Sequence, residues 1–269
     1  MPELPEVERA RATIERAALH RTIADVDDTD SYVCRPHTPG QLKDALVGRQ
    51  LSEACRRGKA MWCTTSRSGP LLGLHLGMAG RIVVTEPDGS VVEGGDPRGG
   101  GYGPSPDGKP EWYRFTLTFE SGATMRLFDK RRLGRVRLDP DLDALGPDAE
   151  MVRVAEFRDR VGRGTAPVKA RLLDQSVIAG VGNLLADETL WQARIDPRRR
   201  VSDLDHDDLT RLHRALGTAT RAAIRKGGVH TGEVIPHRRA GAECPRCGAE
   251  MQRATVGSRT TWWCPEEQV

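Results

Sequence analysis

The sequence predicts an α+β protein of two domains, in which an N-terminal helix and a β-sandwich precede a helical domain. A chain of 269 residues is long enough for two compact domains. Its first half carries short apolar, β-rich runs separated by Gly, Pro and Asp clusters, a pattern typical of a sandwich or barrel. From about residue 150, apolar residues recur at helical spacing. We expect a β domain over 1–139, a helical domain over 140–236 and a small cysteine-bearing hairpin module over 237–269.

The β domain is expected to open on a helix and to continue as a series of strands. Residues 5–17 begin with proline and glutamate and offer Val7 and Ile14 for one buried face, which favours a helix. A short helix is expected at 41–47, and the stretch 94–110, dense in turn-forming residues, predicts a long exposed loop. Strands are expected at 22–26, 50–55, 60–65, 71–76, 81–85, 113–119, 123–128 and 133–138.

The second half reads as a set of helices without an internal repeat. Helical spacing covers 152–161 and 168–175, and a further helix over 183–193 has Asn183 as its expected N-cap. A long helix over 205–226 begins with aspartates and is stopped by two glycines.

Charge is unevenly distributed, although the net charge is only +3. Residues 1–150 hold 21 cations and 23 anions, whereas 151–269 hold 20 and 15. Two segments are strongly basic: 126–137, with six cations and one anion, and 221–259, with eight and three. Such segments are either solvated faces or contact surfaces for a polyanion, because phosphate contacts release counterions. Charge alone leaves both interpretations open.

Two classes of protein are excluded by the apolar pattern. No apolar run reaches the ~18–20 residues that span a bilayer, and the acidic N-terminus lacks the apolar region of a secretory signal. We therefore expect a cytoplasmic protein.

The N-terminus has the residue types of a nucleophilic site. If Met1 is removed, Pro2 provides a secondary amine, and an α-amino group titrates at about 8, so part of it is neutral at cellular pH. A neutral amine can attack an aldehyde-like carbon and form a Schiff base. Glu3 and Glu6 supply carboxylates beside it for proton transfer. Taken alone, the segment is more typical of an ordinary helix start.

Two glycine-containing segments, at Lys59 and at Asn183, could bind phosphate, although each also has an ordinary structural interpretation. A third segment, at His75, is typical of a structural strand end. Lys59 follows Arg-Arg-Gly between two expected strands, where a turn would expose its ammonium group. His75 and Met78 lie in His-Leu-Gly-Met-Ala-Gly at a strand end. Gly180-Val-Gly-Asn183 joins two expected helices, and the exposed amides of a helix N-terminus suit a phosphate.

The cysteines divide into scattered residues and one cluster. Cys244-Pro-Arg-Cys247 is followed after sixteen residues by Cys264, a spacing typical of a zinc-binding hairpin. The fourth position is Glu267, which can ligate zinc, although Glu266, His237 or His230 could replace it. The alternative is a metal-free hairpin held by packing of Trp262 and Trp263. The single cysteines Cys34, Cys55 and Cys63 are expected to be buried as small apolar residues.

Taken in order, these motifs resemble a known family. PELPEVE, RRGK, HLGMAG, DKRRLG, GVGN and CPRCG…RTTWWCP, spread from Pro2 to Pro265, are similar to those of the formamidopyrimidine-DNA glycosylase and endonuclease VIII family of base-excision repair enzymes. The PELPE start is closer to the formamidopyrimidine branch. The resemblance implies a helix–two-turn–helix in the helical domain and a zinc-finger-like β-hairpin at its end.

The resemblance also implies a reaction and its residues. Pro2 would attack the sugar C1′, expel an oxidised base and form a Schiff base, and β,δ-elimination would cut both sides of the abasic sugar. Glu3 would assist sugar ring opening and proton transfer, Glu6 and Lys169 would lie at the lesion, and Lys59 would contact phosphate near it. No catalytic metal is implied, and zinc would be structural.

The implied partner is damaged double-stranded DNA, bound by a monomer. A flipped base leaves a hole in the duplex, which side chains fill. Residues implied in DNA binding are His75, Met78, Arg131, Leu133, Asn183 and Arg259. We expect the cations among the implied site residues to converge on one groove.

Two departures from the family pattern affect specificity. Leu133 stands where the family usually has a phenylalanine beside the estranged base, and only fifteen residues, 229–243, separate the second glycine after the long helix from Cys244. Formamidopyrimidine enzymes that cap 8-oxoguanine have a longer loop there, so oxidised pyrimidines and ring-opened lesions are equally consistent. A non-catalytic relative that only binds lesions is the alternative function.

Overall fold

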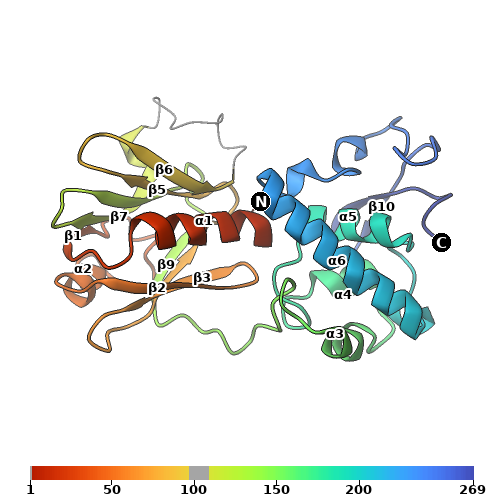
Figure 1. The fold of residues 1–269 in the computed structure, drawn as a ribbon, viewed down its shortest axis with the longest axis horizontal. Helices are drawn as coiled ribbons and strands as arrows, with labels where there is room; N and C mark the ends of the chain where they lie inside the picture. The colour runs from red at the N-terminus through yellow and green to blue at the C-terminus, as the bar shows by residue number, and fades with distance from the viewer. Residues whose placement is uncertain (1, 97–108) are drawn as a thin grey trace. The chain divides into compact units, whose positions relative to one another are not determined.

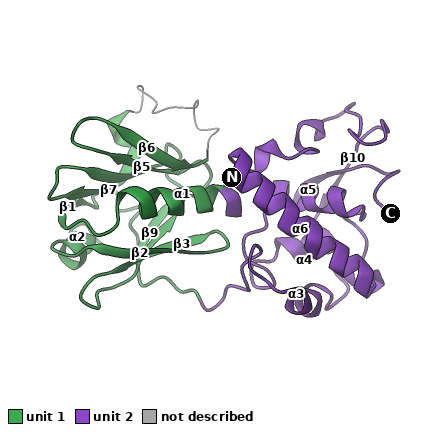
Figure 2. Ribbon diagram, in the orientation of Figure 1, with its two compact units in different colours: residues 1–2, 6–142 green, residues 3–5, 143–269 purple. Residues whose placement is uncertain are grey.

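The chain forms two compact units in the computed structural model, which describes residues 2–96 and 109–269 (Figure 1, Figure 2). The first unit contains Pro2 and Glu6–Leu142, and the second contains Glu3–Pro5 and Asp143–Val269. The division therefore falls after Leu142, the short segment 3–5 belongs to the second unit, and the terminal hairpin lies within that unit.

The N-terminal helix α1 runs over Leu4–Ala17 because its apolar residues recur at helical spacing. Val7, Ala10 and Ile14 are buried in the core of the first unit, whereas Leu4 belongs to the core of the second. The predicted helix over 5–17 is confirmed within one residue.

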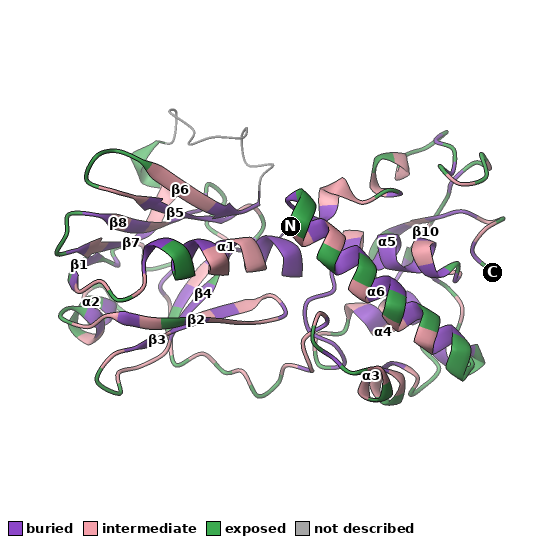
Figure 3. Cartoon of the chain, viewed as in Figure 1, coloured by how far each residue is buried: buried purple, intermediate pink, exposed green. Residues whose placement is uncertain are grey.

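Two antiparallel sheets form the sandwich of the first unit. One has the order β1-β7-β8-β5-β6 and the other β2-β3-β4-β9, and the buried side chains of both sheets form one core with α1 (Figure 3). The alternation of buried and less buried residues along β3 and β7 is that of strands with one core-facing side. The strands are β1 Ile23–Asp27, β2 Leu51–Arg57, β3 Ala60–Thr65, β4 Leu72–His75, β5 Arg81–Thr85, β6 Val91–Gly95, β7 Tyr113–Phe119, β8 Thr124–Phe128 and β9 Arg135–Leu138.

Most differences from the predicted elements of this unit are small. The short helix α2 is Gln41–Leu46, and each of the eight predicted strands is present. The prediction missed β6, which pairs with β5 and includes the first two residues of the expected loop 94–110. A 3-10 turn over Pro110–Trp112 begins at the last residue of that loop. Residues 97–108 of the loop lie outside the described part of the chain.

The second unit is built from four helices and the terminal hairpin. They are α3 Val154–Val161, α4 Val168–Leu173, α5 Asn183–Ala193 and α6 His206–Lys226, with α5 packed on α6. Asp205 caps α6 by accepting from the amide of Asp208, and Gly227 ends it at φ 101°. Short 3-10 turns lie at Val201–Asp203, Val229–Thr231 and Ile235–His237.

The predicted N-cap of α5 is wrong. Gly182 occupies the N-cap position and Asn183 is the first helical residue, because the first amides of α5 are bound by a carboxylate from elsewhere in the chain.

The hairpin consists of β10 Gln252–Val256 and β11 Arg259–Trp263. Its two-residue turn, Gly257–Ser258, has φ values of 57° and 60°, as the tightest hairpin turns require. Gly257 is needed there, since a Cβ would lie 3.0 Å from two atoms of Ala170 on α4. Among the described residues, no helix combines the length and apolar character needed to cross a membrane.

Candidate active site

The residue that follows Pro2 is anchored to the N-terminus of α5. The Glu3 carboxylate accepts hydrogen bonds from the backbone amides of Gly182, Leu184 and Leu185, at 3.0, 2.9 and 2.9 Å. The positive end of the helix dipole stabilises an ionised carboxylate at this position. Glu3 is 2% exposed, so this carboxylate has a fixed location.

The glycine turn before α5 is shaped by this contact. A Cβ on Gly182 would lie 2.3 Å from Cδ of Glu3, which leaves room only for glycine. Gly180 adopts φ 114°, and its carbonyl accepts from the amide of Leu4 at 3.1 Å. The glycines of the GVGN motif thus accommodate the N-terminal segment.

Lys59 lies in the tight turn between β2 and β3, as predicted. Arg57 pairs with Ala60 across the turn, and Gly58 adopts φ 59°. Arg56, which precedes Arg57, is structural, because its guanidinium group binds Glu8 on α1 at 2.8 Å. Glu6 is also on α1 and is 2% exposed.

His75 ends β4 and accepts a hydrogen bond at Nδ1 from the amide of Gly77 at 3.0 Å. Burial and the positive charges of Arg135 and Lys59 lower the pKa of His75, and the neutral ring then carries its proton on Nε2. His75 can therefore donate a hydrogen bond to an acceptor such as a phosphate oxygen.

The loop over 129–134 lies beside the HLGMAG segment. A Cβ on Gly77, at φ 61°, would lie 2.5 Å from the carbonyl carbon of Leu133. Asp129 is fully buried and accepts from the amides of Arg131 and Gly134 at 3.0 and 2.5 Å, and these bonds fix the backbone of the loop. The structure thus places Met78, 36% exposed, next to the loop that carries Arg131 and Leu133.

Lys169 forms a fully buried ion pair rather than lining an open pocket. Its Nζ lies 2.6 Å from Oδ1 of Asp187 and donates to the Thr261 hydroxyl at 2.8 Å. Burial lowers the pKa of Lys169, and the charge of Asp187 opposes that shift. Asp187 therefore neutralises the ammonium group of Lys169 inside the second unit, and the expected position of Lys169 at the lesion stays a prediction.

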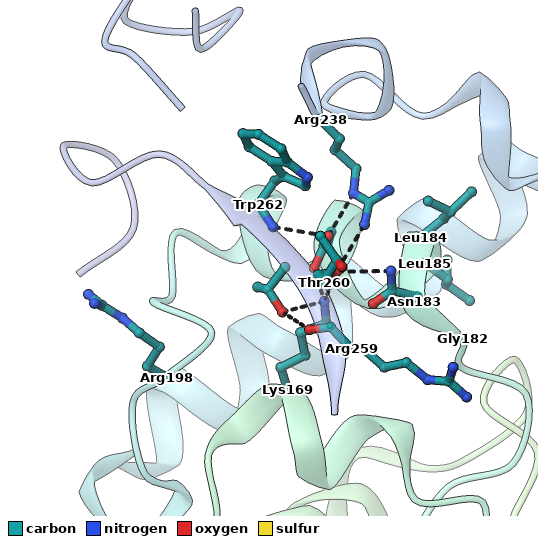
Figure 4. Close-up of polar contacts among 12 residues, drawn as sticks. Lys169, Gly182, Asn183, Leu184, Leu185, Arg198, Arg238, Arg259, Thr260 and Trp262 are labelled. Atoms are coloured by element: carbon teal, nitrogen blue, oxygen red, sulfur yellow. Dashed lines mark hydrogen bonds and ion pairs between the residues drawn. The ribbon is translucent and has the colours of Figure 1, made fainter. Parts of the chain in front are cut away.

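The carbonyl of Thr260 is the centre of a hydrogen-bond network that fixes the hairpin (Figure 4). It accepts from Nδ2 of Asn183 at 3.0 Å and from Arg238 and Lys169 at 3.3 Å each. Arg238 also binds Oδ2 of Asp187 at 2.7 Å. The adjacent Arg259 is exposed, and its side chain extends away from the network.

Asp187 and Arg238 are the residues that the sequence interpretation missed in this network. Asp187 lies one helical turn after Asn183, so their shared helix face was the available signal. Nothing set Arg238 apart from the other cations of the basic segment 221–259.

Three thiols gather at the base of the hairpin. The Sγ atoms of Cys244, Cys247 and Cys264 lie within 4.8 Å of one another, and Trp191 donates to Cys244 at 3.4 Å. A tetrahedral zinc site with Zn–S distances of about 2.3 Å needs sulfur atoms about 3.8 Å apart, so these thiols fit three corners of a metal site. The cluster can bind a metal.

The prediction of Glu267 as the fourth ligand is not supported by the geometry. Its carboxylate pairs with Arg246 at 3.2 Å and Arg194 at 3.3 Å. In the described part of the chain, the potential metal ligands of this cluster are the three thiols, without Glu266, His237 or His230. Two arginines compete for the carboxylate, which explains its position outside the cluster.

One unit has glycine-linked helices and a cysteine-bearing hairpin, and the other contains Pro2 and the sandwich. Together they define a DNA-repair enzyme of the helix–two-turn–helix class. Models of known families agree with this class. The formamidopyrimidine-DNA glycosylase N-terminal domain matches residues 1–136, and the formamidopyrimidine-DNA glycosylase H2TH domain matches residues 144–233. The chain belongs to the formamidopyrimidine-DNA glycosylase family, whose members are DNA glycosylases with abasic-site lyase activity.

Individual relatives span nearly the whole chain. The sequence is 34% identical to the formamidopyrimidine-DNA glycosylase of Nocardioides sp. over 98% of this chain and 93% of the relative. It is 33% identical to that of Roseiflexus sp. over 100% of both chains. Lactococcus lactis Fpg in complex with abasic-site DNA has a TM-score of 0.80 at 26% identity, and each chain is 99% covered.

Proposed function

We propose that this enzyme excises oxidised bases from duplex DNA and cleaves the resulting abasic site through a Schiff base on Pro2. The Pro2 nitrogen attacks C1′, the bond from C1′ to the base breaks, and the base leaves with that electron pair and takes up a proton. Opening of the sugar ring transfers a proton to O4′ and leaves an iminium ion between Pro2 and C1′. β- and δ-elimination then expel the two phosphates in turn.

The observation that carries this proposal is the fixed carboxylate next to the nucleophile. Glu3 follows Pro2 directly, and three backbone amides hold its oxygens in place. A carboxylate at that position can exchange a proton with O4′ as the sugar ring opens. A protein that only binds lesions would have no need of a positioned carboxylate beside a secondary amine, so the geometry favours the enzyme.

The remaining site residues are proposed to bind DNA. Lys59 and His75 in the first unit and Arg259 in the second would contact phosphates, and Glu6 would lie in the lesion pocket. Asn183 orients the hairpin strand through one N–H of its side-chain amide, which donates to Thr260, and the second N–H would donate to a phosphate. Met78, Arg131 and Leu133 would fill the space of the flipped base.

Oxidised and ring-opened bases are the proposed substrates. Related Lactococcus lactis Fpg structures, each 27% identical to this chain, contain a FAPY-dG DNA and an oxidised-pyrimidine DNA. The short segment 229–243 is tied to α5, because the amide of Val234 donates to Glu188 at 3.0 Å. A restrained short segment offers little chain to cover 8-oxoguanine, so we propose a preference for ring-opened purines and oxidised pyrimidines over 8-oxoguanine.

We further propose that the three-cysteine cluster binds a structural zinc ion. Zinc would link Cys244 and Cys247 to Cys264 and so hold the base of the hairpin that presents Arg259. We expect about one zinc per purified chain and its loss in Cys247→Ser, measured by atomic absorption. Equal zinc content in both proteins would contradict the assignment.

Covalent trapping tests the proposed reaction. With borohydride and an abasic-site duplex, we expect a stable adduct whose reduced sugar lies on the tryptic peptide 2–9. Retention of Met1 converts the Pro2 nitrogen to an amide, and we expect at least a hundred-fold less adduct because that nitrogen is no longer nucleophilic.

Pro5→Ala is the matched control, since it changes the other proline of the segment and leaves the N-terminal amine unaltered. We expect this variant to be trapped. An adduct on the peptide that contains Lys59 or Lys169, or equal trapping with Met1 retained, would refute Pro2 as the nucleophile.

A further inference from the structure

Three arginines surround one exposed aromatic ring in the first unit. Tyr32 is 45% exposed, and the guanidinium carbons of Arg35, Arg135 and Arg132 lie 3.9, 4.8 and 5.6 Å from its ring centroid. We call these four residues the Tyr32 cluster. They come from two segments that are about a hundred residues apart in the sequence.

The Tyr32 cluster carries more positive charge than its surroundings neutralise. Among the residues that the structure describes, the carboxylate in contact with it is that of Asp30, which pairs with Arg132 at 2.7 Å and also with Arg114 at 3.6 Å. Within residues 2–96 and 109–269, no carboxylate lies within 4 Å of the guanidinium nitrogens of Arg35 or Arg135. Side-chain hydrogen bonds from Arg35 and Arg135, together with their positive charges, lower the pKa of Tyr32.

Burial does not explain this arrangement. A cation over an exposed aromatic face gains only about 0.5–1 kcal/mol, and three guanidinium groups around one ring repel one another. Since the ring is exposed, the repulsion is not offset by a buried core. An anion that bridges the guanidinium groups would offset it, and the planar fork of arginine matches the two oxygens of a phosphate.

The Tyr32 cluster is continuous with the loop over 129–134. Arg132 lies between Arg131 and Leu133 and adopts φ 53°, and its Nε and Nη2 donate to Asp30 at 3.0 and 2.7 Å. Because Arg132 belongs both to this loop and to the cluster, a phosphate group next to the loop would be near the guanidinium groups of the cluster.

We infer that the Tyr32 cluster binds backbone phosphates of the DNA strand opposite the lesion, beside the point where Arg131 and Leu133 enter the duplex. The inference rests on the proposed function, because that function places this loop next to the estranged base. Arg35 and Arg135 would each contact a phosphate, and Tyr32 would hold both guanidinium groups in position.

The salt dependence of binding to a duplex with a stable abasic-site analogue tests this inference. Each phosphate contact contributes about 0.9 to the slope of log K against log salt. We expect Arg35→Ala to lower the slope by about 0.9 and the double variant Arg35→Ala/Arg135→Ala by about 1.8. Arg16→Ala, which removes an exposed arginine of α1, is the matched control with an expected unchanged slope.

The strand is identified with neutral methylphosphonates placed next to the estranged base or, separately, next to the lesion. We expect a methylphosphonate in the undamaged strand to weaken wild-type binding and to have little further effect on Arg35→Ala. The inference would be overturned if the affinity losses from Arg35→Ala and from a methylphosphonate in the undamaged strand were fully additive. It would also be overturned if the two losses were non-additive only for a methylphosphonate in the lesion strand.

Two controls separate this result from other failures. Tyr32→Phe keeps the ring and should keep the wild-type slope, and Arg35→Ala alone tests the cluster if the double variant does not fold. An unchanged slope in Arg35→Ala, while wild type binds and is trapped by borohydride, would refute the cluster and leave the proposed function intact. Absence of trapping in wild type would instead refute the proposed function.

Discussion

The two proposed DNA-contacting loops, one in each unit, are held in place by different chemistry. In the first unit, Asp129 supports the loop over 129–134 by accepting two backbone amides. In the second, Asp187 supports the hairpin strand next to Arg259 by neutralising two cations, Lys169 and Arg238, which both donate to the carbonyl of Thr260. Both aspartates are at most 1% exposed, so the difference lies in their partners and not in their burial.

This difference teaches that equal burial does not mean equal energetic importance. Loss of Asp129 would leave two neutral amides without partners, whereas loss of Asp187 would leave the buried ammonium of Lys169 without its counter-charge. An unpaired buried charge costs more than an unpaired amide.

The largest expected effect is therefore on the stability of Asp187→Ala. We expect a loss of about 3–5 kcal/mol in the free energy of unfolding, against about 1–3 kcal/mol for Asp129→Ala. Urea denaturation followed by tryptophan fluorescence measures both. Glu250→Ala, an exposed acidic residue of the second unit, should change stability by less than about 0.5 kcal/mol.

Equal losses in the free energy of unfolding of Asp187→Ala and Asp129→Ala would contradict this difference. They would mean that the charge of Lys169 is solvated or neutralised in another way. Lys169→Met combined with Asp187→Leu should recover part of the loss, since it removes both charges together.

A smaller effect, on DNA binding, is expected for Arg259, the exposed arginine next to the hydrogen-bond network of Asp187 and Thr260. Arg259→Ala should lower the salt slope of DNA binding by about 0.9 and leave unfolding within about 0.5 kcal/mol of wild type. Arg253→Ala, an exposed arginine of the facing strand β10, is the matched control. An equal fall in both variants would indicate that the hairpin contributes only its overall charge.

The helices and tight turns were predictable from the sequence, because the residues that determine each of them lie close together in the chain. Apolar periodicity gave the N-terminal helix and α6, and glycine positions gave the turn at Lys59 and the start of α5. The strand β6 escaped because it precedes a glycine-rich stretch and ends in two glycines.

Partners that come from distant residues were not predictable in the same way. The amides at the start of α5 are bound by Glu3, about 180 residues earlier, and not by Asn183. Likewise, the charge of Lys169 is neutralised by Asp187, and that of Glu267 by two arginines. A residue type shows which bonds are available, but the three-dimensional fold selects the partner.

The placement of residues 3–5 has a consequence for how the enzyme can be divided or recombined. The two family models meet between residues 136 and 144. However, Leu4 packs in the core of the second unit, and Glu3 accepts from two amides of α5 and from that of its N-cap residue, Gly182. A fragment that begins at Asp143 would lack a core side chain and a helix cap, so the two halves are not independent modules. Exchange of either half between relatives would have to preserve this tripeptide together with the turn that receives it.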